Sequence, residues 1–250
     1  AAALYCKLLL KNRQTHYIVI CDHIGDFLIT MGYLTAYKQH NQKHITVCIA
    51  NQLQELLNAY PFGWDQYVQL PSVKLYKLLT IGATNFGIHI LKKFGNITLV
   101  NPADAFAEEA FQYIMRYPTI TLKDCIQYGC LHLDKDASFF PPHFEEKADL
   151  ENISGFQKGK TVLLSPYARA VSVEDIKIFT VLARLLKKQG FVVLTNISDS
   201  RQKPVPGTQS VTCTLTQVVS LVRTGGYVVG IRSGLLDLLA YTKCTMVAIY

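Results

Sequence analysis

The sequence predicts an α/β protein made of two Rossmann-like parallel-sheet domains that face a cleft. Three observations lead to this prediction. Short runs of β-branched apolar residues alternate with segments of helical periodicity, as in parallel sheets with crossover helices. The alternation stops in a charged, proline-containing stretch near residues 134–147 and restarts at residue 161. Half of the 250 residues are hydrophobic, which is enough to bury a full core, and the length suggests one or two domains.

The first half of the chain reads as strand–helix–strand–helix–strand, followed by further elements. The predicted strands are residues 16–21, 44–50, 65–70 and 96–100, and the predicted helices are residues 27–38, 51–60, 72–93 and 103–116. Right-handed crossovers would join these strands into a parallel sheet. We therefore assign residues 1–145 to an N-terminal domain and residues 146–160 to a linker.

The second half repeats the same rhythm over residues 161–250. The predicted strands are residues 161–165, 191–195, 227–230 and 245–250, and the predicted helices are residues 172–188, 214–222 and 233–241. Ser172 and Asp175 form a capping-box-like start for the first of these helices. The chain stops on a strand without a covering helix, which is typical of a shorter or truncated nucleotide-binding domain.

Charge and cysteine content limit the classes of partner. The net charge of +7 favours phosphate-bearing ligands, but lysine and arginine are scattered, so we expect no nucleic-acid binding. The seven cysteines include no CxxC pair, which indicates free thiols in a reducing cytoplasm. No apolar run is long enough to span a membrane. The amphipathic residues 4–13 suit either peripheral contact with the inner membrane face or a helix that caps the domain.

The first candidate site is the sequence CDHIGD at residues 21–26, between a strand and a helix. Ligands of parallel sheets bind at the carboxyl ends of the strands. Gly25 lets the backbone turn tightly, and Asp26 falls in the first helical turn, where it can act as a general base if burial raises its pKa. Alternatively, Asp26 only stabilises the helix N-terminus. Asp22 and His23 are either ligand contacts or ordinary polar loop residues.

The second candidate site is the sequence GIRSGLLD at residues 230–237, again between a strand and a helix. Ser233 suits a helix N-cap, and the amides of Gly234 and Leu235 would form an anion site that fits a phosphate. The guanidinium of Arg232 could bind phosphate oxygens beside it. The alternative is a capped helix with a surface arginine.

A third segment, LSPYARAVS at residues 164–172, offers Arg169 for a further phosphate contact at the same sheet edge. Sequence signatures of other enzyme classes are absent or too weak to use. The chain has no GxGxxG, P-loop or HExxH sequence and no metal-ligand cluster, so we expect no metal and no cofactor. The triplet Asp134-Lys135-Asp136 matches the short DxD pattern of metal-dependent transferases, but in a polar turn we interpret it as chance. Ser165 lacks the GxSxG context of a serine hydrolase.

The two candidate sites together resemble the ADP-heptose:lipopolysaccharide heptosyltransferase family, which has the two-domain glycosyltransferase fold called GT-B. The stretch YIVICDHIGDFLITMGYLTAYKQHNQKHITVCIA is similar to the opening of the family, and WDQYVQLP to its next strand. The stretch GYVVGIRSGLLDLLAYTKCTMVAIY resembles the donor segment VGxDSGxxHLA. The resemblance covers roughly residues 17–70 and 160–250.

The resemblance implies a glycosyltransferase that is inverting and needs no metal. Asp26 matches the family's catalytic base, and Ser233 and Gly234 match its donor diphosphate contacts. Arg232 stands where the family usually has Asp, and Asp237 where it usually has His, so the resemblance does not identify ADP-heptose as the donor. The implied partners are a nucleotide-sugar donor, which is a substrate rather than a cofactor, and a glycan or glycolipid acceptor of lipopolysaccharide or polysaccharide biosynthesis.

Two other functions fit the same residues. A non-catalytic nucleotide-sugar-binding or assembly protein of a polysaccharide pathway would explain the altered donor segment. An epimerase-like enzyme on the same fold would react without an acceptor.

Overall fold

The computed structural model describes residues 15–20, 23–71, 96–100, 119–144, 150, 153–168 and 176–250. The predicted helices over residues 72–93 and 103–116, the residues Asp22 and Arg169, the amphipathic residues 4–13 and the helix start at residue 172 lie outside these ranges. The chain divides into two compact units, Ala1–His143 and Phe144–Tyr250. Each unit is described by itself.

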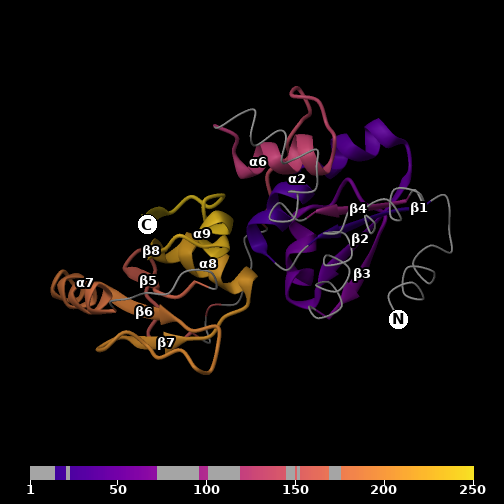
Figure 1. Ribbon diagram of the computed structural model, residues 1–250. Coiled ribbons are helices and arrows are strands. Elements are labelled where there is room, and N and C mark those ends of the chain that lie inside the picture. The colour runs from indigo at the N-terminus through magenta and orange to yellow at the C-terminus, as the bar shows by residue number, and fades with distance from the viewer. Residues whose placement is uncertain are drawn as a thin grey trace. The chain divides into compact units, whose positions relative to one another are not determined.

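The first unit contains a parallel sheet of four strands in the order β3-β2-β1-β4 (Figure 1). Its elements are β1 (Thr15–Ile20), α2 (Ile24–Asn41), β2 (His44–Ala50), η1 (Asn51–Ala59), β3 (Gln66–Leu70), β4 (Ile97–Val100), α6 (Leu122–Asp124) and η2 (Cys125–Cys130). The predicted strands of this half are confirmed to within one or two residues. β1 lies between β2 and β4, which explains why it is apolar on both faces.

One helical segment differs in type from its prediction, and a second lies where the sequence predicted no element. Residues 51–59 form a 3₁₀ helix, because Leu53, Leu56 and Ala59 repeat every three residues and so line one face of a helix with three residues per turn. Residues 125–130 form a π-helix after the short helix α6. Gln127 in this π-helix is buried; it accepts a hydrogen bond from the Tyr33 hydroxyl at 2.5 Å and donates to the Asp134 carbonyl at 2.6 Å. The bond from Tyr33 attaches the segment to α2, and the bond to Asp134 holds the loop that follows it.

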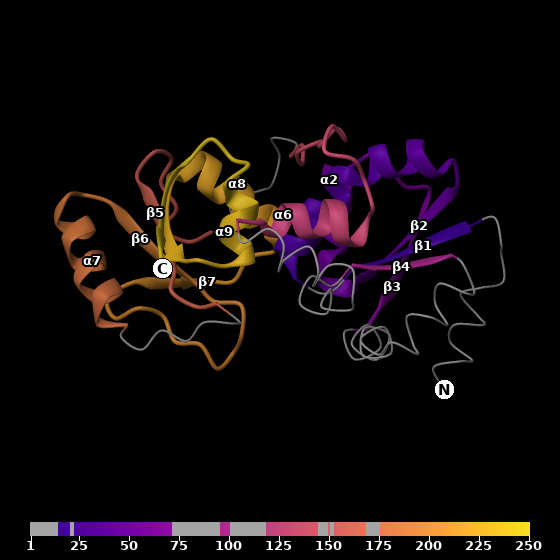
Figure 2. The ribbon, with the colours of Figure 1, turned by 45° about the horizontal axis from the view of Figure 1, so that its top comes forward.

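The second unit contains a parallel sheet of five strands in the order β7-β6-β5-β8-β9. Figure 2 labels β5, β6 and β7 of this sheet, with helix α7 beside them. Its elements are β5 (Thr161–Ser165), α7 (Lys177–Lys188), β6 (Val192–Asn196), β7 (Gln209–Val211), α8 (Leu215–Gly225), β8 (Gly226–Ile231), α9 (Gly234–Leu239) and β9 (Thr245–Ile249). The sequence did not predict β7, because its three residues are mostly polar and follow two prolines.

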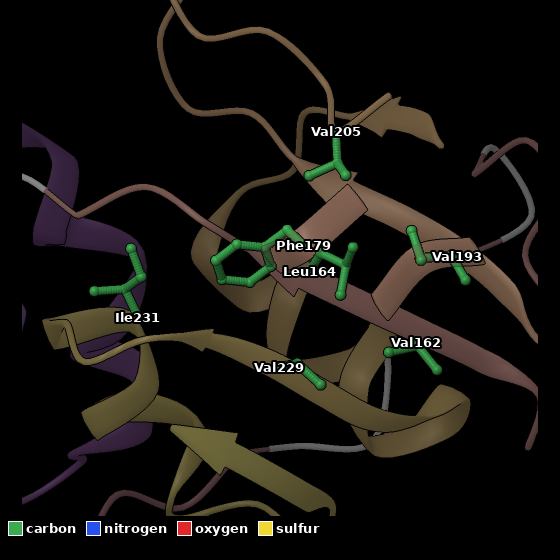
Figure 3. Packing of buried hydrophobic residues seen from close by; sticks show 8 residues of the cluster. Val162, Leu164, Phe179, Val193, Val205, Val229 and Ile231 are labelled. Atoms are coloured by element: carbon green, nitrogen blue, oxygen red, sulfur yellow. The ribbon is translucent and has the colours of Figure 1, made fainter. Parts of the chain in front are cut away.

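The core of the second unit lies between α7 and one face of its sheet. Figure 3 shows the side chain of Phe179 from α7 among strand residues of β5, β6 and β8. The cluster consists of Val162, Leu164, Phe179, Ala183, Val193, Val205, Val229 and Ile231. Because side chains of a strand alternate between faces, Leu163 points to the opposite face of the sheet. The packing therefore requires only one side of α7, the side that carries Phe179 and Ala183.

The domain boundaries deduced from the sequence stay a prediction. The described residues of the proposed linker 146–160 bond within the second unit. The Gly159 amide donates to the Thr224 carbonyl at 3.0 Å, and the Val192 amide donates to the Lys160 carbonyl at 2.8 Å. This segment therefore leads directly into β5.

Candidate functional site

The strand order of each sheet defines a switch point where ligands of open parallel sheets bind. In the first unit the chain runs outward from β1 to β2 and β3 and then returns to β4 on the other side of β1. In the second unit it runs outward from β5 to β6 and β7 and then returns to β8 on the other side of β5. The switch points therefore lie at the carboxyl ends of β1 and β4 and of β5 and β8. The candidate segments follow β1, β5 and β8.

In the first unit Asp26 occupies the third position of α2, an 18-residue helix that begins at Ile24, after β1 has ended at Ile20. The residue is only 6% exposed. Partial positive charge at a helix N-terminus stabilises a carboxylate in this position. Thr30 fixes the backbone of this turn, because its hydroxyl donates to the Asp26 carbonyl at 2.7 Å. Gly25, which precedes Asp26, is also buried.

His23 is the N-cap residue of α2 and has an extended backbone. Its side chain does not cap the helix, and 57% of it is exposed. The Nδ1 atom lies 3.6 Å from the Asp26 carboxylate oxygen Oδ2. An exposed imidazole beside a buried carboxylate can relay a proton between that carboxylate and solvent. The predicted pair of His23 and Asp26 is therefore brought together at the switch point of the first sheet.

In the second unit the switch point is closely packed around Gly230. Gly230 of β8 pairs with Ser165, the last residue of β5. A Cβ atom on Gly230 would lie 2.8 Å from the Ser165 carbonyl oxygen, closer than van der Waals contact allows. Ser165 itself is buried. The sequence did not single out Ser165 for this position; the signal that was available is that it ends an apolar strand.

The residues after Gly230 form the predicted strand-to-helix turn. The Arg232 amide donates to the Ile249 carbonyl of β9 at 3.0 Å, and the Arg232 residue is exposed. Ser233 is the N-cap of α9 with an extended backbone, and its carbonyl accepts from the Asp237 amide at 3.0 Å. The amides of Gly234 and Leu235 lie in the first turn of α9, where helix amides have no partner within the helix.

The hydroxyl of Ser233 does not cap α9 as expected. Its Oγ atom is buried, and it has no hydrogen-bond partner within the part of the chain that the structure describes. A buried hydroxyl without a partner carries an unfavourable desolvation cost. A bound anion at the turn would give this hydroxyl an acceptor.

Asp237 lies one turn into α9 and is half-buried. Burial raises the pKa of the Asp237 carboxyl above its usual range, although the positive charge of Arg232 acts in the opposite direction. Burial also raises the pKa of Tyr241, and the negative charge of Asp237 adds to this shift. The turn thus holds one arginine and one carboxyl in electrostatic contact.

The other candidate groups are separate from these turns. Tyr167 of the LSPYARAVS segment donates its hydroxyl to the Lys203 carbonyl at 2.6 Å. Asp134 and Asp136 lie in the loop after the π-helix, and within the described ranges no three potential metal ligands cluster.

The described cysteines include five free thiols, and burial raises the pKa of one of them, Cys48, to about 12. The five are Cys48, Cys125, Cys130, Cys213 and Cys244. No helix in the described ranges is long and apolar enough to cross a membrane.

Comparisons with solved structures identify the fold. A family 9 glycosyl transferase from Veillonella parvula matches 96% of this chain and 81% of its own, with a TM-score of 0.59 and 12% identity. ADP-heptose lipopolysaccharide heptosyltransferase II from E. coli matches 94% and 84%, with a TM-score of 0.60 and 13% identity. The chain has the fold of the heptosyltransferases.

A second heptosyltransferase agrees with this assignment. The E. coli heptosyltransferase WaaC, solved with ADP, matches 94% of this chain and 87% of its own, with a TM-score of 0.58 and 12% identity. No protein-family model and no curated protein sequence matches the chain. The heptosyltransferase resemblance predicted from two short motifs is therefore confirmed by the fold, as is the expectation of two parallel-sheet α/β domains.

Proposed function

We propose that this protein is a glycosyltransferase that takes a sugar from a nucleotide-sugar donor. One observation carries the proposal. In a chain with the heptosyltransferase fold, the turns at Asp26 and at Arg232–Ser233 directly follow strands at the switch points of the two sheets. Switch points are where such sheets bind ligands. The solved neighbours include heptosyltransferases in complex with ADP and with an ADP-heptose analogue, which supports a nucleoside diphosphate as part of the donor.

The second unit is proposed to hold the donor diphosphate. The Gly234 and Leu235 amides and the buried Ser233 hydroxyl supply donors for phosphate oxygens, and Arg232 supplies a positive charge. Asp237, two residues after Leu235, would contact the sugar of the donor, and Arg169 would add a second positive charge. As the bond between sugar and diphosphate breaks, negative charge grows on the leaving group, and these groups would stabilise it.

The first unit is proposed to activate the acceptor. Asp26 would accept the proton of an acceptor hydroxyl while that oxygen forms a bond to the anomeric carbon and the diphosphate leaves from the opposite side. This single displacement inverts the anomeric configuration and uses no metal. His23 would pass the proton on to solvent, and Asp22 and Gly25 would complete the acceptor-side loop. The acceptor is proposed to be a bacterial cell-surface glycan or a lipopolysaccharide-type glycolipid.

A thermal-shift panel with ADP, UDP, GDP, dTDP and CMP tests the donor class. A ligand that binds only the folded state raises the unfolding temperature, so one of these nucleotides should do so in a concentration-dependent way. Inorganic phosphate serves as the control for simple anion binding. If none of the five nucleotides shifts the transition more than phosphate does, the proposal is wrong.

A second candidate function is a nucleotide-sugar-binding protein without transferase activity. The charges at the donor turn favour it, because a carboxyl at residue 237 beside Arg232 offsets the positive charge that a diphosphate would meet. Nucleotide binding without any release of sugar, across a panel of donors and with a glycan acceptor present, would support this second function. Release of the nucleoside diphosphate that depends on acceptor would support transfer.

A further inference from the structure

Helix α7 of the second unit has apolar residues on two different sides. Phe179 and Ala183 are buried in the core between the helix and the sheet (Figure 3). Away from this side, Ile178, Val181 and Leu185 are 59%, 46% and 52% exposed. A helix that only covers a sheet needs one apolar side, with polar residues opposite. The three exposed residues therefore require a separate explanation.

The three exposed side chains form a continuous stripe. They are spaced by three and four residues, which places them on one side of an α-helix with 3.6 residues per turn. A single exposed leucine or valine is ordinary on a protein surface, whereas a row of large apolar side chains along a helix marks a contact surface. The stripe extends over two turns of α7.

The charges around this stripe all have the same sign. The helix carries Lys177, Arg184, Lys187 and Lys188 and no acidic residue. On a helical wheel Lys177, Arg184 and Lys188 fall within about 40° of one another, immediately beside Val181. Lys187 is held differently, because its ammonium group donates to the Gly207 carbonyl.

Two further lysines lie near the same end of the helix. Lys158 and Lys160 are exposed, and the Lys160 carbonyl accepts from the amide of Val192, just after the turn that ends α7. Among the described residues of this unit the acidic side chains are Asp199 and Asp237. Asp199 is paired with Arg201, and Asp237 lies in the donor turn near Arg232. Among the described residues, the charged side chains next to the stripe are thus basic.

We infer that α7 docks the second unit onto an anionic lipid surface. The apolar stripe enters the boundary between headgroups and acyl chains, while Lys177, Arg184 and Lys188 contact lipid phosphates. Helices with an apolar side and a basic polar side bind membrane interfaces in this way. A second copy of the chain fits the same surface poorly, because pairing two α7 helices would bring like charges together. This inference does not depend on the transferase proposal.

Co-sedimentation of the full-length protein with vesicles tests the inference. Vesicles of phosphatidylcholine with about a third phosphatidylglycerol should bind the protein, and pure phosphatidylcholine vesicles should bind it far less. Raising the salt concentration should weaken binding, since lipid charges are screened. Each basic residue near an anionic membrane contributes about fivefold to partitioning, so Arg184→Gln with Lys188→Gln should reduce binding roughly 25-fold.

Matched variants distinguish the contribution of the α7 stripe to vesicle binding from that of exposed charged or apolar side chains elsewhere. Ile178→Ser with Leu185→Ser should reduce vesicle binding at least tenfold without changing the circular dichroism spectrum, because both side chains are exposed. Lys243→Gln and Phe62→Ser alter an exposed charge and an exposed ring elsewhere and should bind like the parent protein.

Three results would overturn the inference. The parent protein fails to bind the anionic vesicles, or the α7 variants bind as well as it does. The third is a dimer in sedimentation velocity that the Ile178→Ser, Leu185→Ser variant dissociates, which would make this stripe a protein interface.

Discussion

Gly230 and Ser165 approach each other so closely that a methyl group on Gly230 would lie 2.8 Å from the Ser165 carbonyl oxygen and 3.0 Å from its Cβ. Both residues are at the carboxyl ends of neighbouring strands, directly before the segments that carry Arg232 and Tyr167. The backbone at this point is part of a sheet ladder and has little freedom to move. The glycine therefore sets the spacing of the two strands at the switch point of the second sheet.

We expect Gly230→Ala to destabilise the second unit and to weaken ligand binding at the donor turn. Overpacking of this kind costs about 1–3 kcal/mol, which corresponds to a decrease of roughly 2–12 °C in the unfolding temperature of a chain of this size. Thermal unfolding followed by circular dichroism measures it. The double variant with Ser165→Gly should stay destabilised, because the closer clash is with the main-chain oxygen. An unfolding temperature equal to that of the parent protein would contradict the close contact.

Arg232→Ala is expected to weaken the binding of nucleoside diphosphate without affecting folding, because Arg232 is exposed. A charge-assisted hydrogen bond to phosphate is worth about 1.5–3 kcal/mol, so the dissociation constant for ADP should rise roughly 10- to 100-fold. Isothermal titration calorimetry measures this change. Lys243→Ala removes a charge of the same sign from an exposed site in the same unit and is the control. Equal loss of affinity in both variants would mean that only the overall charge matters.

Asp26→Asn is expected to reduce turnover while leaving donor binding intact. The amide keeps the size of the buried side chain but cannot accept the proton of the acceptor hydroxyl, and loss of a general base typically costs 10²–10⁴-fold in rate. Steady-state kinetics with acceptor, together with ADP titration, separate the two effects. His23→Ala should lower the rate much less, because an exposed relay can be replaced by water. Near-normal turnover of Asp26→Asn would remove this residue from the mechanism.

The strands and the two strand-to-helix turns could be predicted from the sequence because they depend on local patterns. β1 is apolar on both sides, so it had to be an inner strand, and the residues after it had to lie at a sheet edge. The resemblance to heptosyltransferases rested on these same turns.

Features that depend on distant partners could not be predicted. The Gly230–Ser165 contact joins residues 65 positions apart, and Gln127 reaches Tyr33 across 94 positions. The exposed stripe on α7 was hidden as well, because Ile178 and Phe179 look equally apolar in the sequence. Only packing against the sheet reveals which of the two is buried.

Stability of the first unit should depend on pH through His16. Burial, with a smaller contribution from the positive charge of Lys43, lowers the pKa of His16 to about 4. Its Nε2 atom lies 2.8 Å from the Thr98 hydroxyl and 2.9 Å from the Tyr37 hydroxyl, which ties β1 to β4 and α2. The unfolded chain takes up a proton near pH 6.5, but the folded chain keeps this histidine neutral until about pH 4. Stability is therefore unaffected above pH 6.5 and falls as the pH decreases from 6.5 to 4, by on the order of 2–3 kcal/mol.

Urea unfolding followed by tryptophan fluorescence measures this loss. The chain has a single tryptophan, Trp64, and it lies in the first unit. His16→Gln keeps a polar group but does not titrate, so the difference between its stability at pH 7 and at pH 4.5 should be smaller than that of the parent protein. Acid-sensitive carboxylates such as Asp65 contribute equally to both proteins and cancel in the comparison. The same pH dependence in both would show that His16 is not responsible.

Replacing Asp237 should reveal whether its charge opposes binding at the donor turn. Burial raises the pKa of this carboxyl, so its ionised form is disfavoured in the folded protein. The stabilising effect of the protonated form is present at acidic pH and is lost as the pH rises through the raised pKa. Asp237→Asn should therefore raise the unfolding temperature at pH 7 by roughly 1–2 °C, with a smaller gain at pH 4.

The same substitution should tighten ADP binding severalfold at pH 7, because it removes a negative charge near the phosphates while Arg232 stays in place. Calorimetric titration at pH 5 and pH 8 provides the test, and the advantage of Asp237→Asn should be larger at pH 8, where the parent carboxyl is ionised. Asp199→Asn, which alters an exposed carboxylate already paired with Arg201, is the control and should leave ADP affinity unchanged. Weaker ADP binding by Asp237→Asn would contradict this prediction and would mean that the carboxyl contacts the nucleotide directly. Asp237, which stands where the heptosyltransferase motif has His, would then help to determine which donor binds.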